Sequence, residues 1–579
     1  MFEKVSPERE RVVWSVRPRE PAAEVALAEG AGISRVTAAL LRHRGIDTPA
    51  AAKAYLSPSA DGLCDPAQLP DIDEAVRLVN WAIDHRQTVL VHGDYDVDGL
   101  TGTALLVRFL SKLGANVQYF IPHRVHDHYG LSVRALEEAV AEGASLAIAV
   151  DCGTRDLAAI ARARELGLPV IVVDHHEPGD VLPEAAAVVN PKRPGAEYPN
   201  RELSAAGLAL QLARAVGASR GLDDRYVQRA FLDLAAMGTI ADVVPLVGEN
   251  RVLAAVGLAH LGQTKKLGLQ TLLNLCGVTG RPRAEHVGFR LGPRINAAGR
   301  LADAHSALQL LLTADRDEAN RTALYLDSVN RQRQQEQAAI CDAARAAIDR
   351  EVDLSETAVI VLASEAWHVG VVGIAASQMV AAYGRPTVLL AAANGVARGS
   401  GRSIPGFHLA RALDECSDLL LRYGGHAMAV GATVRVEHLD ALRQRLNEVA
   451  RTQIDPAALE PRLEIDAEVG LSEVTGELAL ELARMEPFGN GNPEPALATL
   501  GVRIVDSTVV GREAQHLKLW VTDGGYTYEC IGFGMAREAS WVTRGDSVDL
   551  CFIPQINDFD GSRSLQLRLH AVRQGTGDR

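Results

Sequence analysis

Acidic and imidazole side chains gather directly after three short apolar runs in the first half of the chain. VLVHGDYDVDG ends in alternating acids, IAVDCGT ends in one acid, and VVDHHEP ends in an acid and two histidines. The residues concerned are Asp94, Asp96, Asp98, Asp151, Asp174, His175 and His176. Asp242, in GTIADVVPL, also follows an apolar run and precedes a proline. If these runs end at one place, the side chains form a dense cluster of carboxylates and imidazoles.

Such a cluster favours metal chemistry. Carboxylates packed closely repel one another, and a folded protein normally tolerates them when cations neutralise the charge. Mixed aspartate and histidine ligands suit Mn²⁺ or Mg²⁺ better than a thiolate-bound zinc. A pair of such ions is the usual apparatus for hydrolysing phosphate esters. The set therefore predicts a centre of two divalent cations, Mn²⁺ or Mg²⁺, that catalyses phosphoryl-ester hydrolysis.

A structural interpretation of these acids competes with the chemical one. A single aspartate after a strand is more often a helix N-cap, and Asp151 or Asp174 taken alone fits that role. An N-cap does not explain three alternating acids in one loop together with two adjacent histidines in another. For the whole set we favour the metal centre.

The elements that must position these residues alternate between helices and short strands from about residue 73. Short β-branched runs separated by helical segments predict an α/β fold with a doubly wound parallel sheet. In an open parallel sheet, ligands bind outside the carboxyl ends of the strands. The predicted topology therefore brings the acids to one rim of the sheet.

Four motifs resemble those of the DHH phosphoesterase superfamily: DYDVDG (94–99), VDCGT, VVDHHEP and ADVVPL. Further segments are similar to the RecJ family of bacterial exonucleases, namely LGPRINAAGRL, WHVGVVGIAA, GSGRSIPGFH, YGGHAMAVG, PFGNGNPEP and INDFDG. The resemblance covers the chain from about residue 75 to the C-terminus. It implies a metal-dependent 5′-to-3′ exonuclease on single-stranded DNA that releases 5′-mononucleotides in DNA repair and recombination.

The resemblance also implies roles for individual residues. The metal ligands would be Asp94, Asp96, Asp98, Asp151, His175 and Asp242, with Asp151 as the bridging ligand. Which motif-one acids bind directly stays open. His176 and Asp174 would be catalytic, with His176 contacting the scissile phosphate or acting as an acid. His92 stands where smaller relatives carry a metal-binding histidine that RecJ-like proteins often lack.

Arginines gather in residues 281–300, RPRAEHVGFRLGPRINAAGR, which carry five arginines and one glutamate. Single strands are held by a positive groove with aromatic or arginine stacking partners. Gly292, Pro293 and Gly299 make the backbone geometry of the segment specific, which favours nucleotide contact over a solvated charged loop. The family resemblance places Arg294, Asn296 and Arg300 beside the metals.

A second α/β segment carries another candidate contact. GSGRS (399–403) is glycine-rich, so its amides can approach an anion while Arg402 offers a bidentate hydrogen bond. Together with GGHAMA (424–429) it resembles the substrate-binding motifs of the DHH-associated domain, which would hold the 5′ end of the strand. The residues implied are Ser400, Arg402, Ser403, Gly425 and His426.

We expect five regions along the chain. They are an N-terminal extension (1–72) with one helical stretch from Ser34 to Arg44, a DHH domain (73–300), a connecting helix (301–352), a DHH-associated domain (353–455) and an OB-like β-barrel (456–579). The barrel is predicted from alternating apolar and polar residues. The connecting helix would place the second domain opposite the first, leaving a groove too narrow for duplex DNA. The cluster His123, Arg124, His126 and His128 would form a loop at the substrate entrance.

Composition sets limits on the class of protein. With 47 % hydrophobic and 23 % charged residues in 579, the chain is neither disordered nor collagen-like nor a coiled coil. The net charge of 59 − 73 = −14 argues against a surface coated for gripping duplex nucleic acid. Because many acids are expected metal ligands while arginines gather locally, we expect a salt-sensitive hold confined to the single-strand path.

Cysteine usage and hydropathy favour the cytoplasm. The seven cysteines include no CxxC pair, which indicates neither a zinc knuckle nor a disulfide framework. The N-terminus is too charged for a signal peptide, and no apolar run is long enough to span a bilayer. The resemblance implies single-stranded DNA, a helicase and a single-strand-binding protein as partners. We expect a monomer and no membrane association.

Three alternatives remain open at this level. The first is a DHH phosphoesterase for short oligoribonucleotides, cyclic dinucleotides or pyrophosphate, which the length and the OB-like region disfavour. The second is a catalytically inactive scaffold that only binds single strands, which the intact acids disfavour. The third is a single-stranded RNA nuclease, which only a test of both sugars would distinguish.

Overall fold

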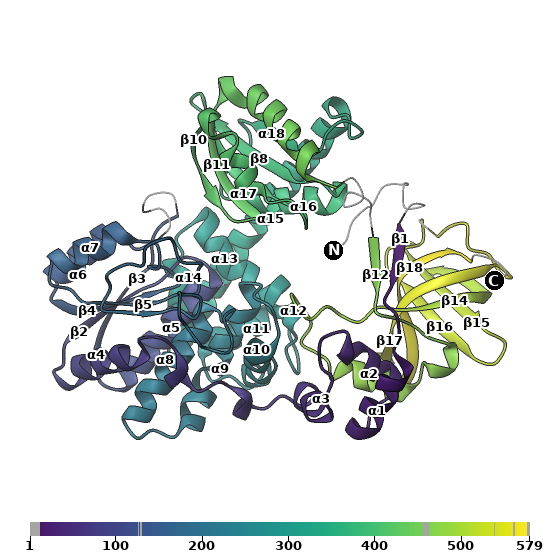
Figure 1. Cartoon of the computed structure of the whole chain (residues 1–579), viewed down its shortest axis with the longest axis horizontal. Coiled ribbons are helices and arrows are strands. Elements are labelled where there is room, and N and C mark those ends of the chain that lie inside the picture. The colour runs from purple at the N-terminus through teal and green to yellow at the C-terminus, as the bar shows by residue number, and fades with distance from the viewer. Residues whose placement is uncertain are drawn as a thin grey trace. The chain divides into compact units, whose positions relative to one another are not determined.

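A computed structural model describes residues 12–124, 127, 130–455, 462–537, 539–559 and 562–575 (Figure 1). The chain forms two compact units. One consists of Ser57–Gln332 with Glu486–Glu494, and the other of Met1–Leu56, Arg333–Met485 and Pro495–Arg579. None of the helices in the described part of the chain has the length and apolar character that a bilayer crossing requires.

The first unit contains a five-stranded parallel sheet. Its strands are β2 (Thr88–His92), β3 (Asn116–Phe120), β4 (Ala144–Val150), β5 (Val170–Val173) and β6 (Ala187–Val189), in the order β3-β2-β4-β5-β6. Every neighbouring pair is parallel. The order reverses between β2 and β4, and a parallel sheet leaves its ligand crevice at such a switch point.

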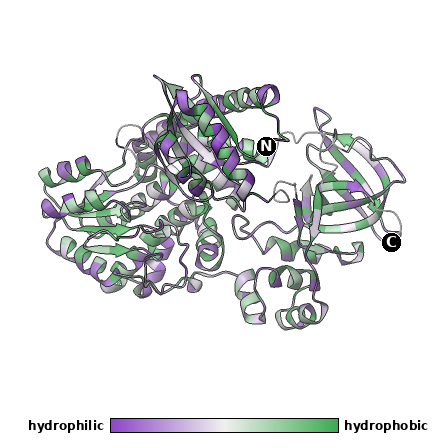
Figure 2. Ribbon diagram, turned by 45° about the horizontal axis from the view of Figure 1, so that its top comes forward, coloured by the Kyte–Doolittle hydropathy of each residue, from purple (hydrophilic) through white to green (hydrophobic). Residues whose placement is uncertain are grey.

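Helices alternate with these strands, as predicted for a doubly wound fold. They are α4 (Ile72–Asp84), α5 (Val97–Lys112), α6 (Val133–Ala141) and α7 (Leu157–Glu165). Strands β2, β4, β5 and β6 are mostly buried because helices cover them, whereas the edge strand β3 is partly exposed; Figure 2 shows the strands as mostly hydrophobic. The predicted fold class is confirmed for this unit.

A helical layer follows the sheet in the sequence. It comprises α8 (Ala205–Ser219), α9 (Asp224–Ala241), α10 (Gly248–Leu261), α11 (Leu267–Leu275), α12 (Ala284–His286), a π-helical segment (Val287–Leu291), α13 (Gly292–Leu301) and α14 (His305–Leu312). Helix α5 packs against both α8 and α9, and Phe109 meets Phe231 edge to face at 6.0 Å between ring centroids. This layer therefore packs on α5, the helix that follows β2.

The connecting helix predicted over 301–352 is present as α15 (Arg316–Glu351), 36 residues without glycine or proline, and it starts later than predicted because α14 occupies His305–Leu312. At about 1.5 Å per residue it is roughly 54 Å long. It begins in the first unit and ends in the second.

The second unit contains a mixed five-stranded sheet. Its strands are β7 (Ile360–Ser364), β8 (Thr387–Ala393), β9 (Val396–Arg402), β10 (Leu420–Gly425) and β11 (Ala429–Arg435), in the order β10-β11-β9-β8-β7. Only β7 and β8 pair in parallel. The accompanying helices are α16 (Val372–Tyr383), α17 (Leu409–Asp414) and α18 (Leu439–Gln453).

The C-terminal region forms the predicted barrel. Its strands are β13 (Ala467–Glu468), β14 (Leu497–Val510), β15 (His516–Thr522), β16 (Thr527–Gly532), β17 (Ser547–Phe559) and β18 (Ser562–Gln574), and helix α19 (Gly476–Ala483) precedes β14. The strand order is β13-β14-β15-β16-β18-β17, and β14 also pairs with β17. That extra pairing closes the sheet on itself, which removes its exposed edges.

The N-terminal region differs from the prediction of one helical stretch. It contains β1 (Val13–Val16), α1 (Pro21–Ala31), α2 (Arg35–Arg42) and α3 (Pro49–Leu56). The predicted helix is α2, which Ser34 caps by accepting a hydrogen bond from the Thr37 amide. Strand β1 pairs in parallel with β12 (Arg462–Ile465), so its order depends on a partner far away in the sequence. Local pattern could not reveal that pairing.

Candidate metal centre and nucleic-acid contacts

The structure brings all six predicted ligands together at the carboxyl ends of β2, β4 and β5 and the end of α9. One group within 4.8 Å contains Asp94, Asp96 and Asp151, and a second contains Asp98, His175 and Asp242. A third group, Asp151 with His175 and His176, joins the first two. Two sets of three ligands that meet through shared residues match what a two-cation centre requires.

Motif one forms the loop from β2 into α5. Asp96 is the N-cap of α5, and its carboxylate accepts hydrogen bonds from the amides of Asp98 (2.9 Å) and Gly99 (3.1 Å). A Cβ atom on Gly99 would lie 2.7 Å from the Asp94 amide nitrogen, so only glycine allows the loop to turn this tightly. The N-cap interpretation weighed for Asp151 and Asp174 thus applies to Asp96.

Asp98 is fully buried and lies against the N-terminus of α8. Its two carboxylate oxygens accept hydrogen bonds from the amides of Ala205 (2.7 Å) and Ala206 (2.9 Å). Burial, together with the charge of Asp96, nevertheless raises the pKa of Asp98 to about 7. The carboxylate is thus fixed in position, but its negative charge is disfavoured unless a cation lies nearby.

Three other acids of the cluster also have raised pKa values. Burial raises the pKa of Asp94, Asp151 and Asp242 well above the ordinary value, and neighbouring carboxylates raise each pKa further. The Oδ1 atom of Asp94 is buried and has no hydrogen-bond partner among the described residues. Buried carboxylates that repel one another in this way are the chemical setting that divalent cations neutralise.

Asp151 occupies an unusual backbone conformation at the end of β4. Its φ of 64° lies in the left-handed region, which aspartate enters more easily than most residues but still at a cost. Its amide donates a 3.0 Å hydrogen bond to the Val173 carbonyl, which ties it to β5. The side chain is 3 % exposed and faces both ligand groups.

His175 supplies the imidazole of the cluster in its neutral form. Burial lowers its pKa to about 3, so a lone pair is available for a metal. Its Nε2 lies 3.2 Å from Asp151 Oδ1, 3.6 Å from Asp242 Oδ2 and 3.9 Å from Asp98 Oδ2. Neither ring nitrogen forms a hydrogen bond within the described residues. An imidazole nitrogen facing three carboxylates fits a cation between them, and the donor set fits Mn²⁺ or Mg²⁺.

Asp174 behaves differently from the acids around it. Burial alone would raise its pKa, but hydrogen bonds and the nearby histidines lower the pKa below the ordinary value. It accepts hydrogen bonds from the amides of Thr154 (3.0 Å), His175 (2.8 Å) and His176 (3.2 Å). Its Oδ1 also lies 2.7 Å from His176 Nδ1. The carboxylate is therefore saturated with donors and orients the His176 ring.

His176 is the exposed member of the DHH triplet, with a side chain 33 % accessible. Burial would lower its pKa, yet the hydrogen bond and charge of Asp174 raise it above the ordinary value. A histidine held in this way can carry a proton near neutral pH and face a substrate.

Asn190, which follows β6, is a supporting residue that the sequence reasoning missed. Its side-chain amide donates to Thr154 Oγ1 (3.0 Å) and to the His176 carbonyl (2.9 Å). It therefore joins the loops after β4 and β5. The same strand-end pattern that singled out the acids was visible in AVVNP and could have found it.

His92 lies in the core. It is completely buried, and its Nε2 accepts a 3.1 Å hydrogen bond from the Ser132 amide. Its Nδ1 lies 3.8 Å from Cys152 Sγ, and burial lowers its pKa to about 4. Both nitrogens face protein groups, so the structure gives this histidine a packing role.

The arginine-rich segment lies against motif one, as the resemblance implied. The side-chain carbonyl of Asn296 accepts a 3.1 Å hydrogen bond from the Val97 amide at the start of α5. A Cβ atom on Gly299 would lie 2.6 Å from the Tyr95 carbonyl oxygen, which shows how close α13 comes. Arg300 exerts its charge on Tyr95. Asn296 thus fixes the start of α5, the helix that follows motif one.

Arg294 has a protein partner on α15. Its guanidinium lies 2.9 Å from the Asp327 carboxylate and donates a 2.8 Å hydrogen bond to the Arg290 carbonyl. These contacts fix its orientation beside the segment 287–291.

Arg124 is a further cation near motif one that the sequence reasoning placed only in an entrance loop. It donates a 2.9 Å hydrogen bond to the Gly299 carbonyl, and its guanidinium lies 4.1 Å from the centre of the Tyr95 ring. His126 and His128 of the same predicted cluster lie outside the described residues.

In the second unit, the structure brings GSGRS and GGHAMA together. Gly431 of β11 lies opposite both Ser400 of β9 and Gly424 of β10. Gly425, with a φ of 137°, ends β10, and the His426 amide donates to the Ala429 carbonyl at 2.8 Å. The two motifs therefore occupy one end of one sheet.

The start of α16 approaches the same place. A Cβ atom on Gly373 would lie 3.2 Å from the Ser400 side chain and 3.3 Å from an Arg402 guanidinium nitrogen. Ser403 is buried and donates its hydroxyl to the Phe407 carbonyl at 2.8 Å. Ser400 and Arg402 thus lie beside a helix N-terminus, an arrangement that favours phosphate binding, while Ser403 supports the loop.

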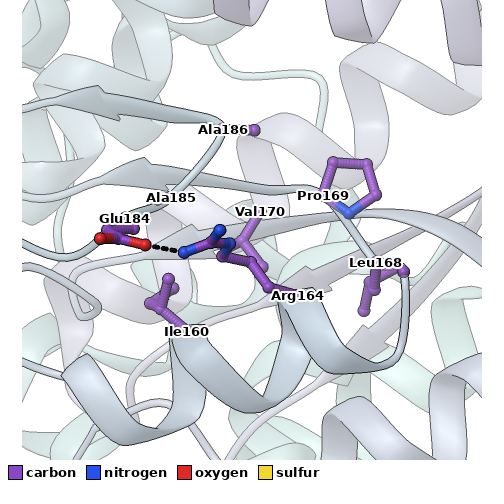
Figure 3. A pocket seen from close by; sticks show the side chains of 9 residues that line it. Ile160, Arg164, Leu168, Pro169, Val170, Glu184, Ala185 and Ala186 are labelled. Carbon is purple, nitrogen blue, oxygen red and sulfur yellow. Dashed lines mark ion pairs between the residues drawn. The ribbon is translucent and has the colours of Figure 1, made fainter.

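A pocket of about 360 Å³ lies at the amino ends of β5 and β6, and it has different chemistry (Figure 3). It is lined by the end of α7 and the start of β5, the strand end opposite to Asp174. Arg164 and Glu184 form an ion pair in it, so its charges are already matched. Catalytic chemistry is not indicated there.

The fold and the metal centre together define a DHH phosphoesterase. The sequence matches the DHH family N-terminal domain over residues 88–239, the DHHA1 domain over 356–452 and the RecJ OB domain over 465–571. The single-stranded-DNA-specific exonuclease RecJ of Bacillus subtilis is 36 % identical over 96 % of this chain and 70 % of its own length. The RecJ of Escherichia coli is 36 % identical over 88 % and 92 %.

Solved structures agree with the sequence matches. RecJ of Thermus thermophilus in complex with Mn²⁺ superimposes with a TM-score of 0.84 at 32 % identity, over 98 % of this chain and 80 % of that one. Its Mg²⁺ complex gives a TM-score of 0.76 at 30 % identity, over 98 % and 79 %. The chain belongs to the RecJ family of single-stranded-DNA-specific exonucleases.

Proposed function

We propose that this protein is a metal-dependent exonuclease that removes nucleotides from the 5′ end of single-stranded DNA and releases 5′-mononucleotides. The observation that carries the proposal is the pair of ligand groups that meet through Asp151 and His175 at the switch point of the parallel sheet. Its relatives in Bacillus subtilis and Escherichia coli are single-stranded-DNA-specific exonucleases, which supports the choice of substrate. DNA repair and recombination would be its setting.

The ligand groups would hold two divalent cations, Mn²⁺ or Mg²⁺. Asp94 and Asp96 would bind one, Asp98 and Asp242 the other, and Asp151 would lie between them with His175 beside it. When bound, the cations would activate a water and neutralise charge on the scissile phosphate. The strained backbone of Asp151 and the N-cap of Asp96 would keep these ligands in place before the cations arrive.

His176 would act on the substrate from the same side of the site. Its ring is held by Asp174 and its raised pKa keeps a proton available, so it would donate a hydrogen bond to a phosphate oxygen or a proton to the leaving group. Asp174 would act through His176 by fixing its ring and stabilising its protonated form.

The DNA contacts would come from three places. Arg294, Asn296 and Arg300 would line the path beside the metals, and Arg124 would join them. Ser400, Arg402, Ser403, Gly425 and His426 would form the site for the 5′ end. The position of Arg402 and Ser400 beside the start of α16 supports a phosphate there. A 5′-end site in the second unit would give the enzyme its polarity.

The barrel would serve as a further platform for single strands. Tyr526 and Phe533 are 48 % and 60 % exposed, and the Lys518 ammonium lies 4.8 Å from the centre of the Trp520 ring. Exposed aromatic rings with adjacent cations stack and hold unpaired bases. A helicase and a single-strand-binding protein would supply and present the strand in the cytoplasm, and the enzyme would act as a monomer.

Digestion of end-labelled DNA tests the proposal. Single and double strands labelled at the 5′ or 3′ end would be incubated with Mn²⁺, Mg²⁺ or a chelator. We expect early release of the 5′ label as mononucleotide from single strands, and no release with the chelator. Early release of the 3′ label would refute the polarity, and equal cleavage of blunt duplex would refute the narrow-groove hypothesis.

The alternatives have their own tests. A series of substrate lengths would reveal a phosphoesterase for short oligoribonucleotides or cyclic dinucleotides, because the rate would then fall with length. Full activity of Asp151→Ala would revive the inactive single-strand-binding scaffold. Equal cleavage of RNA and DNA of one sequence would extend the substrate to RNA.

A further inference from the structure

The residue after Asp242 has a strained backbone that its own side chain does not explain. Val243 has a φ of 64°, and a β-branched residue enters the left-handed region only at an energetic cost. Its side chain is 62 % exposed, so burial does not offset that cost. Such strain persists when surrounding contacts fix the backbone. The turn that follows Asp242 must therefore be held from outside.

The contacts come from the segment Glu486–Glu494, which lies between α19 and β14 in the sequence but belongs to the first unit. Asn490 contacts both ends of the turn. Its side-chain amide donates a 2.8 Å hydrogen bond to the Val243 carbonyl, and its carbonyl accepts a 2.7 Å hydrogen bond from the Leu246 amide. One residue thus bonds to both Val243 and Leu246.

Glycines on either side of Asn490 permit this close approach. A Cβ atom on Gly489 would lie 2.8 Å from Leu246 Cδ1, and one on Gly491 would lie 3.0 Å from Pro245 Cβ. Larger side chains at either position would push the 486–494 loop away from the turn. The close packing therefore depends on PFGNGNPEP, a motif whose role the metal centre alone does not explain.

The 486–494 loop is itself firmly held. The side chain of Asn492, 1 % exposed, donates to the Pro487 carbonyl at 2.9 Å, and its backbone exchanges hydrogen bonds with Gly489. At the start of the loop, Arg251 donates to the Glu486 carbonyl at 2.9 Å. The loop is thus braced internally and anchored to α10, so it can impose a conformation on the turn.

We propose that Asn490 is a positioning residue for the metal centre, and that the 486–494 loop fixes the carboxylate of Asp242 within its ligand group. Asp242 lies at the last turn of α9, where its amide bonds to the Gly238 carbonyl at 2.9 Å, and its side chain is 24 % exposed. The helix fixes one side of Asp242 and the loop fixes the other. The inference rests on the proposed function, because it assigns Asp242 to a cation.

The experiment measures Mn²⁺ binding by titration calorimetry on the full-length chain. Asn490→Ala removes the bond to Val243, and Gly489→Ala pushes the loop from Leu246. Asn80→Ala is the matched control. It removes the 2.8 Å hydrogen bond that the Asn80 side-chain amide donates to the Ser219 hydroxyl elsewhere in the same unit. We expect the weaker Mn²⁺ site to lose about 10-fold in affinity in both loop variants, the lower end for supporting residues of metal ligands. Asn80→Ala should bind as the wild type does.

The outcomes separate this inference from the proposed function. Absence of Mn²⁺ binding by the wild type would refute the metal centre itself. Normal Mn²⁺ affinity in Asn490→Ala and Gly489→Ala, with a working wild type, would overturn the role of the loop alone.

A measurement on the wild type covers the case in which both variants fail to fold. If the loop positions Asp242, then Mn²⁺ must stabilise the loop in return, because coupling between two sites is reciprocal. Hydrogen exchange should slow on Mn²⁺ addition both in residues 243–250 and in 486–494. Slowing in 243–250 without any change in 486–494 would overturn the inference.

Discussion

Two buried acidic regions of the same unit differ in how their charge is satisfied. Asp233, on α9, is 3 % exposed and accepts hydrogen bonds from the Leu234 amide (2.8 Å), the Thr264 hydroxyl (2.6 Å) and the Lys266 ammonium (2.7 Å). Asp94 and Asp151 are buried to the same degree, but they face other carboxylates. Asp233 holds the fold together, whereas the cluster requires cations from solution.

The difference shows how a structural buried acid can be told from a functional one. Both kinds are almost fully buried, so burial alone does not separate them. What separates them is the partner: the protein supplies a cation to Asp233 and leaves the metal cluster to external ions. Asp174 lies between the two kinds, since its donors satisfy it while its neighbour His176 faces outward.

The largest effect is expected from Asp151→Asn. The substitution keeps the size of the side chain and removes the charge of a residue that belongs to one ligand group and lies 3.2 Å from His175 of the other. We expect the nuclease rate to fall about 10³-fold or more, because metal-assisted charge stabilisation contributes several kcal/mol. The metal-free protein should unfold at the same temperature as the wild type or higher, since one source of repulsion is gone. A large fall in thermal stability would instead make Asp151 resemble Asp233.

Lys266→Met tests the other region. It leaves Asp233 buried without its cation, and breaking a buried ion pair costs about 3 kcal/mol or more. We expect a lower thermal unfolding midpoint, measured by circular dichroism, and an unchanged turnover rate per folded molecule. A loss of turnover without a loss of stability would show that the contrast between the two regions is wrong. Arg77→Met, which removes an exposed pair with Glu74, is the control and should leave the midpoint nearly unchanged.

Asp174→Asn addresses the intermediate case. An amide in place of the carboxylate keeps the shape but weakens the hold on His176 and removes the charge that raises its pKa. We expect the turnover rate to fall about 10- to 100-fold, as for other supporting residues of active-site histidines and ligands. The limb of the pH–rate profile that reports His176 should also move to lower pH. An unchanged profile would mean that His176 does not titrate during the reaction.

Much of this site could be predicted from the sequence because its chemistry is local. The alternating acids of motif one and the two adjacent histidines are visible without any structure, and the parallel topology brings their loops together. The partners that satisfy or orient them are not local. Asn190 stands at a strand end and could have been found there, but its partners, like those of Asn490, come together only in the fold. Strand β1 likewise depends on β12, which is far away in the sequence.

The sequence also did not reveal which polar side chains form ion pairs or hydrogen bonds within the protein. The resemblance implied that Arg294 lies beside the metals, and nothing in its motif indicated the ion pair that it forms with Asp327 on α15. Asp242 was expected after an apolar run of undefined structure, and it lies at the end of a helix instead. Motif spacing indicates which residues meet, whereas partner choice depends on packing between distant helices.

The smallest predicted effect is the pH dependence of stability without metal. Above pH 6.5 the unfolded carboxylates are fully ionised, while Asp98, whose pKa is raised to about 7, still retains part of its proton in the folded protein. The pKa values of Asp94, Asp151 and Asp242 are raised in the same direction. The folded state then binds more protons than the unfolded state, so stability must fall as pH rises. His175, with its pKa lowered to about 3, gives the opposite slope, but only below its unfolded value near 6.5.

Thermal unfolding in a chelator between pH 6.5 and 8.5 should therefore show a declining midpoint. Saturating Mn²⁺ should remove the decline, because the cations replace the protons on the same carboxylates. Asp151→Asn should reduce the slope even without metal, whereas Lys266→Met should lower the midpoint and leave the slope unchanged. A slope that persists in saturating Mn²⁺ would place its origin outside the cluster, and the contrast between the two acidic regions would then lose its electrostatic basis.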